Sequence, residues 1–134
     1  MKIHLEYGRD GLDVDLPPEA RATLIRKPAM DLPADPKGAI IAALDAPIGA
    51  GLEIAAGATS ACILICDITR PVPNGLFLRP LIERLMAAGI PPEGITVLVA
   101  TGLHRPNLGD ELEEVLGDPW VQQNVRVENH EARD

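Results

Sequence analysis

Aromatic side chains are almost missing from this sequence, which has one Trp, one Tyr and one Phe among 134 residues. A hydrophobic core must therefore be aliphatic, and it can be, because hydrophobic residues make up 46% of the chain. Basic residues are also scarce, since 12 Lys and Arg stand against 20 Asp and Glu, for a net charge of −8. This deficit argues against a nucleic-acid or polybasic membrane partner, because both require clustered positive charge.

Long apolar runs are absent too, so we expect neither a membrane span nor a signal peptide after Met1. Only two cysteines occur, Cys62 and Cys66, four positions apart in a predicted strand and therefore too distant for a disulfide. We expect them to be buried free thiols, which suits a reducing compartment and predicts a cytoplasmic protein. Gly-rich phosphate-binding and nucleophile-elbow motifs are missing, and the three His show no zinc-site spacing.

The hydrophobic pattern predicts an α/β fold in one domain covering residues 1–134. Apolar residues alternate over 3–7 and 12–16 around a Gly-containing turn, which predicts an N-terminal β-hairpin. Two apolar runs, 61–65 and 95–99, flank a helical pattern, and strands joined in this way lie parallel. The expected fold is thus a mostly parallel central sheet with flanking helices. The other expected elements are a strand at 22–25, helices at 36–44, 52–56, 78–88 and 109–116, and a last strand at 125–127.

Polar residues follow each of the two central strands. The first is followed by Asp67-Ile68-Thr69-Arg70-Pro71, and the second by Thr101-Gly102-Leu103-His104-Arg105-Pro106. Because parallel strands end at the same edge of a sheet, Asp67, Arg70 and His104 should meet where open α/β sheets bind ligands. An acid, a guanidinium and an imidazole at one edge form a candidate active-site corner.

Each of these residues has a catalytic interpretation and a structural one. His104 could be a general acid/base, or a loop histidine that bonds a backbone carbonyl. Arg70 could bind a substrate carboxylate with two hydrogen bonds, or form a salt bridge with Asp67. Asp67 could orient Arg70, whereas a metal-ligand role is weakly supported because no second carboxylate lies nearby in sequence.

The two motifs, with Asp45-x-Pro47-Ile48-Gly49 before them, resemble the nickel-pincer-dependent lactate racemase family. The resemblance runs from about Asp45 to the end and implies a racemase or epimerase of small 2-hydroxy acids. It implies hydride transfer to a nickel pincer nucleotide, with His104 as one of two acid/base histidines. By motif, Arg70 would bind the substrate carboxylate, and Asp67 would have an orienting or substrate-side role.

The resemblance reaches only the N-terminal portion of a two-domain family. The family's cofactor-bearing Lys, nickel-ligating His and second acid/base His have no matching segment, and no Lys follows Lys37. We therefore expect the C-terminal domain to be absent, no metal to be held by this chain and the chain to be inactive alone; its cofactor-binding residues are unknown. Two alternatives stay open: a non-catalytic module that binds an anionic metabolite, and a structural fragment without a ligand.

Overall fold

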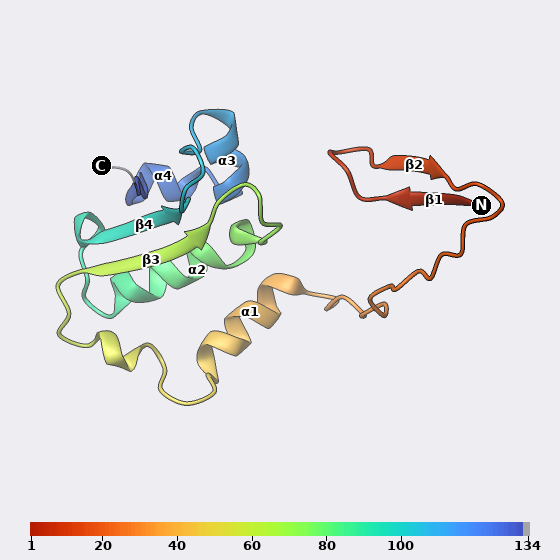
Figure 1. Ribbon diagram of the computed structural model, residues 1–134. Coiled ribbons are helices and arrows are strands. Elements are labelled where there is room, and N and C mark those ends of the chain that lie inside the picture. The colour runs from red at the N-terminus through yellow and green to blue at the C-terminus, as the bar shows by residue number, and fades with distance from the viewer. Residues whose placement is uncertain (133–134) are drawn as a thin grey trace. The chain divides into compact units, whose positions relative to one another are not determined.

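The computed structural model describes residues 1–132, which divide between two compact units, 1–31 and 32–132 (Figure 1). The first unit contains the expected hairpin, in which β1 (Lys2–Leu5) pairs antiparallel with β2 (Leu12–Asp15). The strand expected at 22–25 was wrong. Its residues have no regular structure and Ile25 is 95% exposed, because no neighbouring strand takes up its peptide hydrogen bonds. The expectation of a single domain stays a prediction.

The second unit is built on a three-stranded parallel sheet in the order β3-β4-β5. Strand β3 (Ala61–Cys66) pairs in full with β4 (Ile95–Ala100), and β4 pairs with β5 (Arg126–Asn129). The βαβ unit, the parallel sheet and the α/β class are thus confirmed. Because Cys66 is opposite Ala100, the two central strands end level with each other.

Helices flank this sheet (Figure 1). Asp35 caps the first helix, since its carboxylate accepts the Gly38 N–H at 2.9 Å. The helix expected at 78–88 begins earlier, at Asn74, whose side-chain amide donates to the Val115 carbonyl at 2.7 Å. The remaining bounds are α1 (Pro36–Asp45), η1 (Leu52–Ala55), α2 (Asn74–Ala87), η2 (Pro92–Gly94), α3 (Asp110–Leu116) and α4 (Trp120–Asn124).

Pro80 therefore lies in the second turn of α2. The ring removes one backbone hydrogen bond from the helix, and the packing of the helix offsets that loss. The buried faces of α2 and the sheet form an aliphatic core, as the composition requires. Its fully buried side chains are Leu78, Ile82, Ile90, Ile95, Val97, Val99, Leu116 and Val121.

Helices α2 and α3 approach each other backbone to backbone where α2 begins and α3 ends. A Cβ on Gly75 would lie 2.7 Å from the Gly117 carbonyl oxygen, so no larger residue fits there. Gly117 also takes a left-handed conformation (φ 66°) as the C-cap that ends α3. This contact holds the start of α2 close to α3.

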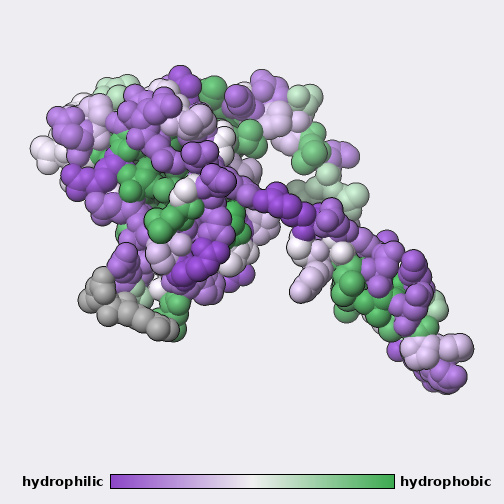
Figure 2. All heavy atoms as spheres, turned by 90° about the horizontal axis from the view of Figure 1, so that it is seen from above, coloured by the Kyte–Doolittle hydropathy of each residue, from purple (hydrophilic) through white to green (hydrophobic). Residues whose placement is uncertain are grey.

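The opposite face of the sheet is open at β3. Leu64 is 67% exposed there, and Cys62 and Cys66, on the same face by strand alternation, are exposed free thiols. The expectation of buried thiols was wrong because, within residues 1–132, the core lies on the other face of β3. Figure 2 shows apolar side chains at the surface of the molecule. Among these same residues no helix is long and apolar enough to cross a membrane.

Candidate functional site

The two strand-end loops meet as the sequence predicts. Asp67 follows β3 directly and is buried, with 5% of its surface exposed. His104 lies in the loop after β4, and its Nδ1 is 2.5 Å from Asp67 Oδ2. Thr69 supports the carboxylate from the other side, because its hydroxyl donates to Asp67 Oδ1 at 2.6 Å. A buried acid thus holds an imidazole whose side chain is 57% exposed.

The contacts of Asp67 fix its charge and the role of each His104 nitrogen. Hydrogen bonds from the Thr69 hydroxyl and from His104, in that order, hold the pKa of the Asp67 carboxyl below its ordinary value. A carboxylate only accepts hydrogen bonds, so His104 Nδ1 must be the donor. Neutral His104 therefore presents an unprotonated Nε2, which can accept a proton from a ligand.

Arg70 lies on the same side of the site. With Asp67, Thr69 and His104 it lines an open cavity of about 250 Å³, whose lining also includes Cys66 and Ala100 at the strand ends. Its backbone N–H donates to the Asp67 carbonyl at 3.0 Å, which fixes the turn between them. Among residues 1–132 its guanidinium has no ion-pair partner, because the Asp67 carboxylate is occupied by Thr69 and His104. The guanidinium is therefore available to an anion.

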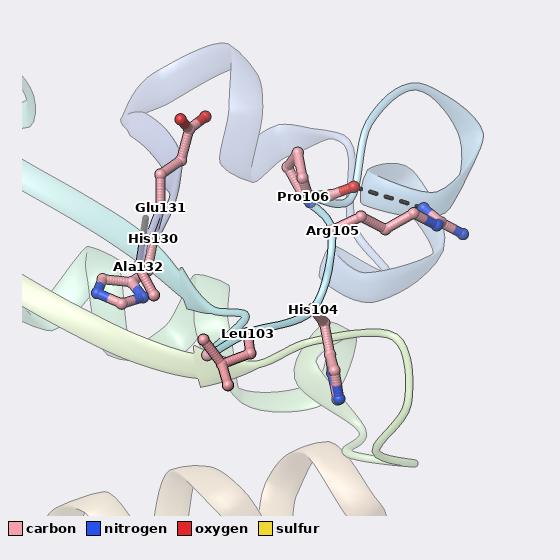
Figure 3. A pocket seen from close by; sticks show the side chains of 8 residues that line it. Leu103, His104, Arg105, Pro106, His130, Glu131 and Ala132 are labelled. Atoms are coloured by element: carbon pink, nitrogen blue, oxygen red, sulfur yellow. Dashed lines mark hydrogen bonds between the residues drawn. The ribbon is translucent and has the colours of Figure 1, made fainter. Parts of the chain in front are cut away.

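A second cavity, of about 380 Å³, lies on the other side of the His104 loop. It is lined by residues 102–106 and 130–132. His104 and His130 point to different sides of Leu103 in this view (Figure 3). His104 and His130 both border this second cavity, whereas the cavity beside Asp67 has His104 and not His130 among its lining residues.

Sequence reasoning missed a polar network beside the site. Asn107, in the loop after β4, is 1% exposed and bonds to Ile68 in the loop after β3 and to Asn129 at the end of β5. Arg105 makes two 2.6 Å hydrogen bonds to the Glu111 carboxylate on α3. An Asn directly after a proline indicates only a loop, because its partners lie 22 and 39 residues away.

The network makes a pH-dependent contribution to stability. The Arg105 guanidinium and then the Asn107 amide lower the pKa of Glu111 from 4.5 to about 2. A lowered native pKa adds stability above the ordinary value and loses it as pH falls toward the native one. We expect Glu111→Gln to lower the Tm above pH 4.5, with the difference shrinking toward pH 2. Thermal melts across this range measure it.

The same change at an exposed acid, Glu19→Gln, serves as the control for the loss of one negative charge. An equal loss of Tm in both variants at every pH would contradict the assignment of the effect to the Arg105 pair.

Within residues 1–132 there is no group of three His, Cys, Asp or Glu side chains that could hold a metal ion.

The parallel sheet flanked by helices defines an α/β protein, and the acid, histidine and arginine at one edge form a candidate ligand site where such sheets usually bind ligands. Residues 7–134 match the lactate racemase N-terminal domain family, and the chain belongs to that family. It is 37% identical over 93 residues to the lactate racemase of Lactiplantibacillus plantarum. It is 28% identical over 135 residues to that of Thermoanaerobacterium thermosaccharolyticum.

These alignments cover 68% and 98% of this chain, but only 22% and 31% of the two relatives. The chain therefore spans less than a third of the length of the curated relatives it matches. The resemblance seen in the sequence motifs is confirmed at the level of the family.

Proposed function

We propose that this chain is the N-terminal, substrate-side domain of a racemase or epimerase of small 2-hydroxy acids, of which lactate is the type. The observation that carries the proposal is the His104–Asp67 pair, 2.5 Å apart, in one cavity with Arg70. Membership in the lactate racemase family supports this substrate class. The chain alone is proposed to be inactive, and a C-terminal domain is its proposed partner.

The geometry suits a 2-hydroxy acid because such a substrate carries a carboxylate next to a hydroxyl. The Arg70 guanidinium would bind the carboxylate with two parallel hydrogen bonds. That contact would place the neighbouring hydroxyl toward Nε2 of His104, which accepts its proton. The Asp67 carboxylate stabilises the imidazolium that forms, and His104 returns the proton when the substrate is rebuilt.

Inversion at the substrate carbon also requires that its hydrogen be removed and returned on the other face. A nickel pincer nucleotide, the cofactor implied by the family resemblance, would supply hydride acceptance. Residues 1–132 do not fit that group, since no three metal-ligating side chains gather among them. We therefore propose that the rest of a longer racemase holds the cofactor.

We also propose a cytoplasmic location, because the free thiols of Cys62 and Cys66 fit the reducing conditions there.

The test is chiral turnover by a racemase chain that contains this domain at the length of its relatives, made with its cofactor-synthesis enzymes. D- and L-2-hydroxy acids, starting with lactate, are supplied separately, and the other enantiomer is measured. We expect turnover by the long protein and none by the 134-residue chain assayed beside it.

The outcomes separate the proposal from its alternative. No turnover of any 2-hydroxy acid by a nickel-loaded long protein would overturn the substrate class. A long protein without nickel that still binds hydroxy acids in calorimetry would identify a module that binds anionic metabolites without catalysis. In that module the Arg70→Gln change would abolish binding.

A further inference from the structure

Asn107 is one of the few polar side chains buried in the second unit, and its amide joins two loops. Its Oδ1 accepts the backbone N–H of Ile68 at 3.2 Å, across 39 residues of sequence. Ile68 directly follows Asp67, and Asn107 lies three residues after His104. The bond therefore connects the two loops immediately beside the Asp67–His104 pair.

The same residue is fixed to the end of β5 by a reciprocal pair of hydrogen bonds. The Asn107 N–H donates to Asn129 Oδ1 at 2.9 Å, and Asn129 Nδ2 donates to the Asn107 carbonyl at 3.0 Å. Two bonds between the same two residues restrain both the position and the direction of the loop backbone. The loop after β4 is thus attached to the end of the neighbouring strand.

A third connection runs to α3. Asn107 Nδ2 donates to Glu111 Oε2 at 3.3 Å, and Glu111 in turn binds Arg105, which directly follows His104. The partners also fix the orientation of the amide, because the Ile68 N–H needs an acceptor and the carboxylate needs a donor. The His104 loop is thus held on its C-terminal side by Arg105 and Asn107 together.

We propose that Asn107 is a positioning residue that keeps His104 in hydrogen-bond contact with Asp67. The imidazole side chain is 57% exposed, so little packing restrains it, and the contact depends on the relative position of two loops. A shift of about 1 Å between reacting groups can cost roughly 100-fold in rate. Asn107 limits such a shift without touching a ligand, and this catalytic role rests on the proposed function.

The test uses NMR of the 134-residue chain, with nitrogen-15 labelling of the histidines and amides. At a pH where the imidazole is neutral, His104 should carry its proton on Nδ1, and the Ile68 amide should exchange slowly. In Asn107→Ala we expect His104 to move toward the tautomer mixture of a solvent-exposed imidazole, and Ile68 exchange to accelerate. In a long racemase the same change should lower kcat by about 10- to 100-fold and leave KM nearly unchanged.

The matched control is Asn124→Ala. The Asn124 side-chain amide donates to the Trp120 carbonyl at 2.8 Å, one turn earlier in α4, so this bond is local to the helix. The substitution should leave the His104 tautomer and Ile68 exchange unchanged. A folded Asn107→Ala chain with the wild-type tautomer would overturn the proposal.

If Asn107→Ala does not fold, the wild-type chain decides by itself, since an Ile68 amide that exchanges at the rate of an unprotected peptide also overturns it. These readouts need no substrate. A failure of positioning is therefore separable from a failure of the racemase assignment, which only turnover reports.

Discussion

Replacing His104 with alanine in a full-length, cofactor-loaded racemase is expected to lower kcat by about 10²- to 10⁴-fold, the usual contribution of a positioned acid/base. The loss arises because no group remains beside Asp67 to accept the hydroxyl proton. Two enantiomers have equal free energy, so kcat/KM must fall by the same factor in both directions. Initial rates from each pure enantiomer measure both values.

His130→Ala is the matched control, since the main-chain groups of His130 make its hydrogen bonds. Its N–H donates to the Val99 carbonyl at 2.9 Å, and its carbonyl accepts from the Thr101 hydroxyl, so both survive truncation of the ring. We expect nearly wild-type turnover from this variant. A His104→Ala enzyme that racemised normally would eliminate the proposed base.

The largest expected loss of stability comes from Ile82→Ala in the middle of α2. Ile82 is 0% exposed in the aliphatic core, and truncating a buried Ile typically costs about 2–5 kcal/mol because it removes apolar contacts and leaves a cavity. Urea unfolding followed by Trp120 fluorescence measures the free energy of unfolding. Trp120 is the single tryptophan and lies in the second unit, so it reports that unit alone.

Ile54→Ala provides the same chemical change at a position that is 75% exposed. We expect it to alter the free energy of unfolding by less than about 0.5 kcal/mol. Equal effects of the two substitutions would show that the second unit is not held together by the core described above.

The sheet and the hairpin were predictable because alternating and continuous apolar runs leave few other structures open. The meeting of Asp67 with His104 was predictable for a related reason, since each follows a strand and parallel strands end at one edge. Their direct pairing was not, because the sequence allowed Asp67 to orient Arg70 instead. In the folded chain Thr69 and His104 occupy that carboxylate.

What stayed hidden depends on contacts distant in sequence. The start of α2 is set by a hydrogen bond from Asn74 to Val115, 41 residues away, and Asn107 acts across a similar separation. The exposure of Cys62 was not predicted from the sequence, for a different reason. Strand alternation indicates which residues share a face, but not whether other elements cover that face.

The open face of β3 determines how the 134-residue chain will behave as a purified reagent. It presents Leu64 between two thiols, so molecules that associate through this face bring cysteines of different copies together. Air oxidation would then convert a reversible encounter into covalent dimers and larger chains, since each copy offers two points of attachment. Samples prepared for spectroscopy therefore need a reducing agent and modest concentration, and serine at both positions would remove the crosslinks.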